Sequence, residues 1–369
     1  MLIHEKGRNL LAVAGIYIAV LMIFLQLGFY SSVPKGALQV YNHLRFDLMM
    51  TSASYVVQGA SFDFPRQRLY QTLSLPQVDT VAPLYQGVAS WLSPEDGIRR
   101  EIFVMGFRPD DPVFDAPDIE RQLDALRRPD TVLVDTMTKP VFGPLTAGRI
   151  VELANRRIEI GGSYALGLGF TGLGAVVASD TNFIRILPYR SLATVSLGLI
   201  RLKPGSNADE VAERIRETLP ADTQVFTRAE LYAHEEEQWV KQAATGIVFG
   251  FGVIVAIIVG IVIVYQTLAT QVTRQLPQYA TLKAMGYSDT YLLRIVVALA
   301  AIMAGVAFVF AFAVAIAIYA QVRTMTPLPV EMTAARAAGV LVLSFAMSAA
   351  SAILAVRILR RADPADLFI

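Results

Sequence analysis

Few side chains in this sequence are suited to chemistry, and the most suggestive group is an acidic stretch that follows His234. Residues 234 to 238 read HEEEQ, close to the H-E-x-x-H pattern in which two histidines one helical turn apart hold zinc. Gln238 occupies the second histidine position. The only other histidines are His4 and His43, and the chain has no cysteine. We therefore expect no metal site and predict that HEEEQ lies on a solvated helix face.

A second stretch, GLGFTG at residues 167 to 172, matches the G-x-G-x-x-G pattern of dinucleotide-binding loops. Such a loop follows a strand and opens a helix whose N-terminus faces the pyrophosphate. The residues that follow here, LGAVVASD, are small or β-branched and favour a strand instead. We predict a turn with close backbone packing in a β-rich domain.

Motifs for nucleotide hydrolysis and serine hydrolysis are missing from the sequence. Lysine never follows glycine, so there is no G-x-x-x-x-G-K-[ST] phosphate loop. A G-x-S-x-G nucleophile elbow is also missing. We therefore expect any ATP hydrolysis to take place in a separate partner subunit. A Ser/His/Asp triad without this elbow stays open at this point, although our expectation is that the chain is not itself an enzyme.

Four long apolar stretches dominate the composition, which is 54% hydrophobic and 17% charged, with a mean hydropathy of +0.48. The stretches 9–34, 242–273, 295–322 and 337–356 contain no charged residue. Each is long enough for a helix that crosses the roughly 30 Å of hydrocarbon in a bilayer. The first exceeds the usual apolar core of a signal peptide, and we interpret it as an uncleaved anchor.

The distribution of charge predicts how these stretches are oriented. Lysine and arginine gather before the first stretch, between the second and third, and after the fourth, whereas 31–240 has an acidic excess. The positive-inside rule then places both termini in the cytoplasm and the large segment outside. The expected division is 1–33 cytoplasmic N-terminus and first span, 34–241 periplasmic domain with stalk ends, 242–273 second span, 274–294 cytoplasmic helix, 295–320 third span, 321–335 short periplasmic loop, 336–357 fourth span and 358–369 cytoplasmic tail.

The segment 34–241 has the pattern of a mixed α/β domain. Strands are expected where β-branched and aromatic residues cluster, and helices where apolar residues recur every three or four positions after a capping residue. Both ends of the segment are expected to continue the adjacent spans as helical stalks, over 34–44 and 228–241. The other expected elements are helices over 64–75, 118–127 and 207–219 and strands over 81–91, 100–107 and 131–135.

The four charge-free stretches contain no histidine either, which disfavours a proton relay or an ion-coupled transport path. The second span instead has a stripe of small residues that would let another helix approach closely. A helix of the same subunit and the same helix of a second copy are both possible partners for this stripe. Its members are Gly246, Gly250, Gly252, Ala256 and Gly260.

A short charged segment, QYATLKAMGYSD at residues 278 to 289, lies between the second and third spans. Pro277 suits the first turn of a helix, Gly286 suits the left-handed residue that ends one, and Ser288 suits the N-cap of the next. The segment could be a simple turn, rest on anionic lipid, or fit a partner's groove. An apolar ridge recurs every three residues, at Tyr279, Leu282 and Met285.

Several stretches, taken in order, resemble the permeases of the FtsX-like, MacB-type ABC transporter family, and most closely its DevC branch. LIHEKGRNLLAVAGIYIAVLMIFLQLGF resembles the first span of that branch, and LRFDLMMTSASYV resembles the stretch that leads into its outer domain. Phe142-Gly143 and VASDTNFIRILP resemble later parts of that domain. ATLKAMGYSD resembles the family's short basic helix, and ADPADLF resembles its C-terminal segment.

The resemblance implies an α-helical membrane protein of the bacterial inner membrane. It would have four transmembrane helices and a large mixed α/β extracytoplasmic (periplasmic) domain inserted between the first and second helices. The segment between the second and third spans would be the coupling helix that docks on a cytoplasmic ATPase. The residues at that contact would be Tyr279, Thr281, Lys283, Met285 and Gly286.

The resemblance also implies a set of partners. The family works as a homodimer of permeases with two copies of an ABC ATPase, which bind ATP and Mg, so no cofactor is expected in this chain. ATP-driven closure of the ATPases would move the stalks and outer domains, a mode called mechanotransmission. A periplasmic adaptor (a membrane fusion protein), a TolC-like outer-membrane duct and membrane lipid are further expected partners, and nucleic acid is not. The cargo implied by the DevC likeness is a glycolipid or another amphiphile.

Three other functions remain open at this point. FtsX-like proteins regulate a cell-wall hydrolase, and related permeases extract lipoproteins. A membrane-anchored sensor or enzyme would instead show a deep pocket with convergent titratable groups.

One departure from the family is visible, because only eight residues precede the first apolar stretch, whereas these permeases usually begin with a longer amphipathic elbow.

Overall fold

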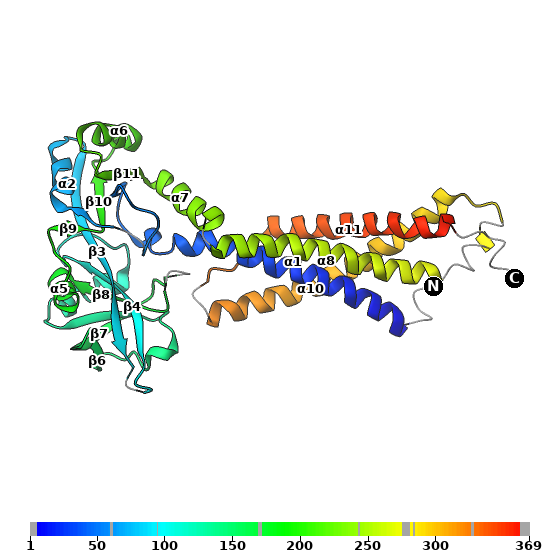
Figure 1. Cartoon of the computed structure of the whole chain (residues 1–369), viewed down its shortest axis with the longest axis horizontal. Coiled ribbons are helices and arrows are strands. Elements are labelled where there is room, and N and C mark those ends of the chain that lie inside the picture. The colour runs from blue at the N-terminus through cyan, green and yellow to red at the C-terminus, as the bar shows by residue number, and fades with distance from the viewer. Residues whose placement is uncertain are drawn as a thin grey trace. The chain divides into compact units, whose positions relative to one another are not determined.

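The chain folds as two units, a helical bundle and an α/β domain. The bundle comprises Met1–Ser32, Ala244–Met325 and Val330–Ile369, and the domain comprises Val33–Ala243 with Thr326–Pro329. Figure 1 shows the elements of both units. The structure, a computed structural model, describes residues 6–59, 62–93, 95–168, 172–242, 244–274, 281–282, 285–325 and 328–361.

The four expected apolar helices are present in the bundle. The stretches long and apolar enough to cross a membrane are Val13–Ala37, Gly246–Arg274, Leu293–Thr324 and Ala334–Leu354. Helices satisfy every backbone hydrogen bond within the segment, which is what a hydrocarbon environment demands. The helices that contain these stretches are α1 (Lys6–Ala37), α8 (Ala244–Arg274), α10 (Asp289–Met325) and α11 (Ala334–Arg361).

Helix α10 packs a row of alanines inward and exposes several large side chains on the opposite face. Alanines recur along one face at 300, 304, 307, 311 and 315, and all are buried. On the opposite face Ile302, Val309 and Phe310 are exposed. Lipid tails are as apolar as these side chains, so close backbone packing rather than hydrophobic exclusion holds such helices together.

Tyr319 of α10 makes a specific contact with α1 within the bundle. Its hydroxyl donates a hydrogen bond to the backbone oxygen of Phe24. Its ring fills the space beside Gly28, where an added Cβ would lie 2.5 Å from Tyr319 Cζ. The hydrogen bond and the glycine together fix where α1 and α10 cross.

A nine-stranded sheet forms the centre of the α/β domain, in the order β11-β1-β10-β3-β4-β8-β5-β7-β6. Each neighbouring pair among its first four strands is antiparallel. With helices α2 (Arg66–Gln71) and α6 (Ala208–Thr218) they have the connectivity of a split β-α-β pair. The strands are β1 (Leu48–Ser52), β3 (Val78–Leu92), β4 (Arg99–Phe107), β5 (Thr131–Asp135), β6 (Ile150–Leu153), β7 (Arg156–Tyr164), β8 (Ala175–Ser179), β10 (Leu197–Leu202) and β11 (Thr223–Thr227).

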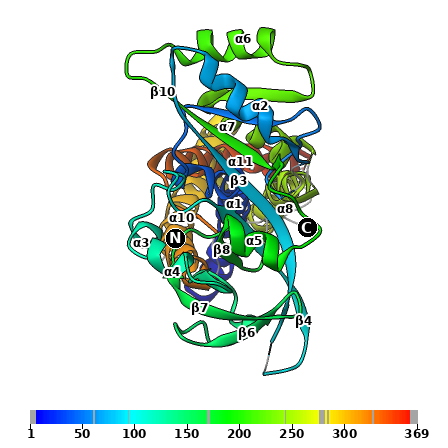
Figure 2. The same ribbon diagram turned by 90° about the vertical axis from the view of Figure 1, so that its left-hand side faces the viewer.

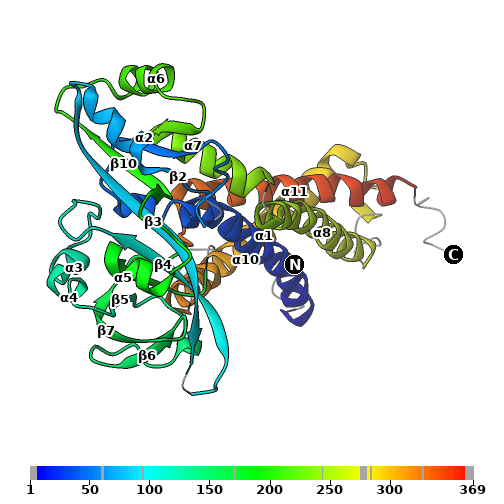
Figure 3. The same cartoon turned by 60° about the vertical axis from the view of Figure 1, so that its left-hand side comes forward.

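Strand β3 belongs both to this open sheet and to a small barrel. Its first half pairs with β10, its second half pairs with β4, and its last residues, Trp91 and Leu92, pair with β6. The last pairing closes a ring of six strands, β3-β4-β8-β5-β7-β6. Side chains fill the barrel, with Trp91 edge-on to Phe142 at 5.9 Å. Figures 2 and 3 show β3 running between the α2–α6 end of the domain and the end that contains β6.

Both faces of the open sheet are covered, so all five residues of β1 are buried. Leu48 and Met50 pack in the core that includes residues of α2 and α6, whereas Met49 packs in a second core. The second core includes Tyr41, from the turn after α1, and Leu231 of helix α7 (Arg228–Glu237). The chain segments next to α1 and α8 therefore cover β1 on one face of the sheet.

Most of the elements expected from the sequence are present. The strands expected over 81–91, 100–107 and 131–135 are β3, β4 and β5, and the helix after Asn207 is α6, with Asn207 Oδ1 accepting from the Asp209 amide at 3.1 Å. The helix expected over 64–75 begins two residues later, because Phe64–Pro65 forms strand β2 and pairs with β9 (Thr194–Val195).

Two expected helices are shorter than predicted. The helix over 118–127 is divided into α3 (Pro117–Glu120) and α4 (Leu123–Leu126), because Gln122 leaves the helical conformation and its side-chain amide donates to the Ser163 oxygen at 2.8 Å. The stalk expected over 34–44 ends at Ala37, followed by a turn and a 3-10 helix, η1 (Tyr41–His43). The stalk over 228–241 is helical as α7, followed by the π-helical turn η4 (Gln238–Gln242).

Gly28→Ala tests the contact between α1 and Tyr319. The new methyl group must displace a ring that is held by its hydrogen bond to Phe24, so we expect a loss of about 1–3 kcal/mol in stability, as for other overpacked cores. Gly339→Ala is the matched control, since a Cβ at this helical glycine meets nothing within 4 Å. Thermal unfolding of the full chain in detergent micelles measures both. A Gly28→Ala protein as stable as the control would contradict the packing account.

Candidate functional site

The loop between α8 and α10 has a helix end with a specific cap. Gly286 has a φ of +91°, and the Tyr287 amide donates to the Leu282 oxygen at 3.2 Å. This six-to-one bond across a left-handed glycine is the Schellman arrangement, which satisfies carbonyls at a helix end. The predicted left-handed conformation of Gly286 is confirmed. Thr281 and Leu282 are helical, while Pro277, Tyr279 and Lys283 lie outside the described residues.

The next helix begins immediately after this turn. Ser288 Oγ accepts from the Tyr291 amide at 3.3 Å, which confirms the predicted N-cap of α10. The rings of Tyr287 and Tyr291 stack with their centroids 4.8 Å apart. Most of the described residues between α8 and α10 therefore take part in a local hydrogen bond or ring contact.

The described part of the predicted apolar ridge is divided between two environments. Leu282 packs against the core of the bundle, whereas Met285 is 68% exposed and Tyr287 and Tyr291 are also exposed. We refer to Met285, Tyr287 and Tyr291 as the loop surface. Methionine and tyrosine are enriched where proteins bind one another, so this arrangement suits a contact with a partner.

The small residues of α8 face other helices of the same bundle. A Cβ added at Gly252 would lie 2.7 Å from Gln26 Oε1 of α1, and one at Gly250 would lie 3.3 Å from the Tyr30 ring. A Cβ at Gly260 would meet Ala19 of α1 at 3.4 Å and the end of Met347. Gly246 and Ala256 are buried. The stripe thus lies against its own subunit, and the large side chains of Phe251, Ile254 and Ile258 are exposed.

The HEEEQ stretch is a solvated helix face only in part: Glu236 and Glu237 are exposed, as predicted, but the prediction is wrong for Glu235. Glu235 is fully buried. Its Oε1 accepts from the hydroxyls of Tyr41, at 3.1 Å, and Tyr55, and from the Gln58 amide at 3.2 Å. Its Oε2 accepts from the Trp239 indole at 3.2 Å. We call Glu235 and these four partners the Glu235 clasp.

Burial raises the pKa of the Glu235 carboxyl, although the hydrogen bonds from Tyr55, Tyr41 and Gln58 oppose that rise. The ring Nε2–H of His234, the residue just before Glu235 on α7, donates to the Val56 backbone oxygen, 2.9 Å away, and the ring lies against Tyr55. A signal for the buried position was present in the sequence. Leu231, Glu235 and Trp239 recur every four residues, which places Glu235 on the apolar stripe of its helix.

The GLGFTG stretch is anchored by a carboxylate rather than open to an anion. Asp135 Oδ2 accepts from the Gly167 amide at 2.6 Å, and Gly167 has a φ of +75°. A phosphate would compete with Asp135 for this amide. Strand β8 follows at Ala175, as predicted, at the place where a dinucleotide-binding loop would lead into a helix. Residues 169–171 lie outside the described residues.

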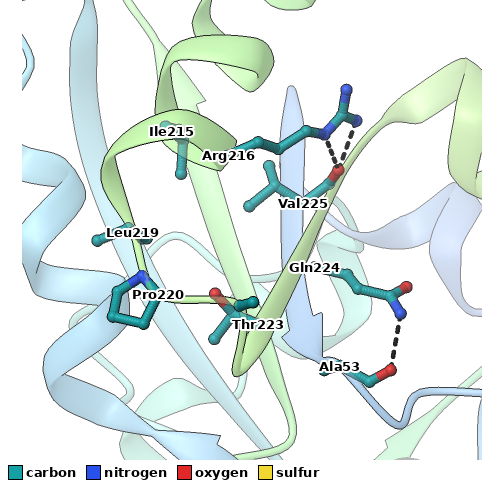
Figure 4. A pocket seen from close by; sticks show the side chains of 9 residues that line it. Ala53, Ile215, Arg216, Leu219, Pro220, Thr223, Gln224 and Val225 are labelled. Carbon is teal, nitrogen blue, oxygen red and sulfur yellow. Dashed lines mark hydrogen bonds between the residues drawn. The ribbon is translucent and has the colours of Figure 1, made fainter.

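A pocket of about 300 Å³ opens between α6 and β11 (Figure 4). Its polar side chains are engaged locally: Arg216 donates twice to the Val225 oxygen, at 3.0 and 2.6 Å, and Gln224 donates to the Ala53 oxygen at 2.7 Å. Titratable groups do not converge there. Among the described residues there is also no group of three histidine, aspartate or glutamate side chains that could hold a metal.

Comparison with known proteins gives two family matches, one in each part of the chain. The MacB-like periplasmic core domain matches residues 9–218, from α1 through α6. The FtsX-like permease C-terminal domain matches residues 250–364, which include all of α10 and α11 and most of α8. No curated protein matches the sequence.

Three solved structures resemble the chain at low identity. The periplasmic region of MacB from Actinobacillus actinomycetemcomitans is 8% identical, with a TM-score of 0.36 over 49% of this chain and 87% of that one. The extracellular domain of the transporter YknZ from Gram-positive bacteria is 11% identical, with a TM-score of 0.33 over 49% and 99%. A domain of a permease protein from Porphyromonas gingivalis is 15% identical, with a TM-score of 0.33 over 56% and 99%.

The fluorescence of Trp239 offers a direct test of the buried carboxyl. The chain has two tryptophans, so Trp91→Phe leaves the clasp indole as the only reporter. Because burial raises the pKa of Glu235 above its ordinary 4.5, we expect the emission to titrate with a midpoint above 4.5. The folded state then holds this proton more tightly than the unfolded chain, so the stability it contributes is present below pH 4.5 and is lost as pH rises through the folded pKa.

Two further variants assign that titration to the correct group. Glu235→Gln in the Trp91→Phe background should abolish it, and His234→Gln should leave it in place. Persistence of the titration in Glu235→Gln, or a midpoint at or below 4.5, would show that the Glu235 carboxyl is not the group observed.

Proposed function

This chain belongs to the MacB-like and FtsX-like family of ABC transporter permeases, and from that premise we propose that it is the membrane subunit of an export system. Members of the family are non-enzymatic transmembrane components that work with an ABC ATPase. We propose that ATP hydrolysis in that ATPase drives movement of the α/β domain. Export would then depend on this mechanical movement and not on a transport path through the spans.

The observation that carries the proposal is the loop surface between α8 and α10. Leu282 holds this loop to the bundle, the Gly286 cap ends its helix sharply, and the exposed Met285 faces outward. Flexible methionine side chains adapt to a partner's groove. A docked ATPase would therefore act on the ends of α8 and α10 through a short, capped loop, as the residues Tyr279, Thr281, Lys283, Met285 and Gly286 were predicted to do.

The spans themselves favour mechanical transmission over a conducting path. Between residues 244 and 274 the helix α8 contains no ionisable side chain before Arg274 other than Tyr265, and its small residues lie against α1. Ion-coupled transport normally needs intramembrane charges. The exposed apolar face of α8 would meet lipid or a second permease copy, and we propose a homodimer with two ATPase copies.

The cargo and outer partners follow from the likeness to the DevC branch alone. We propose that the α/β domain lies in the periplasm of a bacterial inner membrane, with both termini in the cytoplasm. There it would act on a glycolipid or another amphiphile together with a periplasmic adaptor and a TolC-like outer-membrane duct. ATP and Mg would be bound by the ATPase and not by this chain.

Affinity capture of the full chain from native membranes, with an ATP analogue, tests the proposal by mass spectrometry of the bound proteins. We expect an ABC ATPase together with a periplasmic adaptor. Capture of an ATPase with a cell-wall hydrolase would replace export by regulation of that hydrolase. Capture without any ATPase would overturn the proposed function.

Gly286→Val tests whether the loop surface is the ATPase contact. A β-branched residue at this left-handed φ costs roughly 1–2 kcal/mol and should misplace Met285 and Tyr287, so we expect less ATPase to co-purify. Gly205→Val is the matched control, since Gly205 has a similar φ of +85° in a turn of the α/β domain. Equal retention of the ATPase by the two variants would exclude this loop as the docking site.

A further inference from the structure

Three separate chain segments converge on the carboxylate of Glu235. Tyr41 comes from the turn after α1, Tyr55 and Gln58 come from the segment after β1, and Trp239 comes from the π-helical turn after α7. The two tyrosine hydroxyls also contact each other. Tyr41 lies four residues beyond the end of α1, and Glu235 lies nine residues before the start of α8.

The partners of Glu235 are suited to a carboxylate, because they are hydrogen-bond donors directed at both of its oxygens. An ionised carboxylate only accepts hydrogen bonds, and it can accept several on each oxygen. A tyrosine pair, one backbone amide and one indole supply them here, and no lysine or arginine among the described residues bonds to Glu235. An apolar replacement would leave these buried donors without an acceptor.

The same face of α7 makes further bonds to the segment that follows α1. Arg228 donates to the backbone oxygens of Leu44 and Phe46, at 3.1 and 2.8 Å, and its guanidinium lies 4.1 Å from the centroid of the Phe46 ring. The Tyr232 hydroxyl donates to Asn42 Oδ1 at 2.8 Å. Arg228, Tyr232 and Glu235 follow a spacing of four and three, so they line one side of the helix.

We infer that Glu235 is a positioning residue that fastens the segment leading into α8 to the segment leaving α1 and to the sheet, so that the two spans and the α/β domain move together. This inference rests on the proposed function, since it names the joint through which the movement passes. Of the three bonding residues on this face of α7, Glu235 is the fully buried one, and it alone reaches Tyr55, which follows β1. The π-helical turn that presents Trp239 to Glu235 is a rare geometry that recurs at functional sites.

The test measures displacement of the α/β domain at constant ATP hydrolysis. The chain has no cysteine, so Val88→Cys on β3 and Ala334→Cys at the start of α11 give one pair of spin labels in each copy of the chain, on exposed positions. In the proposed homodimer, mixing labelled with excess unlabelled chain leaves this pair as the one that is measured. The full chain, in nanodiscs with its captured ATPase, is measured by electron paramagnetic resonance without nucleotide and with ATP and vanadate. We expect the distance distribution to shift in the otherwise unchanged protein.

Glu235→Ala should abolish that shift while the ATPase stays bound and active, a separation that loss of folding alone would not produce. Glu236→Ala, which removes the adjacent exposed carboxyl, is the matched control and should shift normally. Glu235→Gln keeps one acceptor oxygen for the tyrosines and should restore part of the shift. Should Glu235→Ala fail to fold, Tyr55→Phe and Trp239→Phe each remove one bond of the clasp and should each reduce the shift.

The outcomes separate the inference from the proposed function. An unchanged shift in Glu235→Ala, or in both of the milder variants when that protein does not fold, would overturn the role of Glu235 and leave the proposed function standing. No shift in the parent pair despite ATP hydrolysis would overturn mechanical transmission, and the inference with it.

Discussion

The need to surround a buried carboxylate with donors is the constraint on which the attachment of the α/β domain depends. Glu235 is buried, and none of the described residues that hydrogen-bond to it is a lysine or an arginine. Its charge is compatible with folding because two tyrosine O–H groups, the indole N–H of Trp239 and the backbone N–H of Gln58 donate hydrogen bonds to it. Those donors come from three places in the sequence, so satisfying one carboxylate fixes three backbone segments at once. The turn after α1 and the helix before α8 are thereby held against the same face of the sheet. A hydrophobic contact at this place would be non-directional and would tolerate sliding, whereas hydrogen bonds to a single carboxylate do not.

The sheet that receives these segments is stiffened by its own topology. Because β3 is long enough to pair with β10 at one end and with β6 at the other, the open sheet and the closed barrel share a strand. Any force on β1, which is buried on both faces, reaches β3 through a single intervening strand, β10. The polar pocket beside α6 does not interrupt this path, since Arg216 bonds the edge strand at Val225. A domain stiffened in this way could move as one body, as the proposed function requires.

Sequence patterns could predict the features that depend on local residues. Charge-free stretches marked all four spans, clustered β-branched residues marked β5, and an asparagine cap marked the start of α6. The patterns gave wrong predictions where contacts between residues far apart in the sequence determine the structure. Glu235 sits among two other glutamates and reads as solvated until Tyr41 and Tyr55 are known to point at it, and the helix over 118–127 is broken because Gln122 bonds to Ser163, some forty residues away. The pairing of β3 with β6 is likewise a long-range event that no local period encodes.

The proposed transmission of force requires stiffness at both ends of α8, and α8 has a restraint near each. Next to one end the loop is closed by Gly286 and held to the bundle through Leu282. Next to the other, the preceding helix is tied to the sheet by Glu235. Between them, glycines on α8 bring its backbone close to α1, where bulky side chains would hold the helices apart. Small residues in the span let α8 pack closely on α1, whereas directional hydrogen bonds act near its ends. The two kinds of contact differ because hydrocarbon offers no polar partners to a span, whereas the interior of the domain offers many hydrogen-bonding groups.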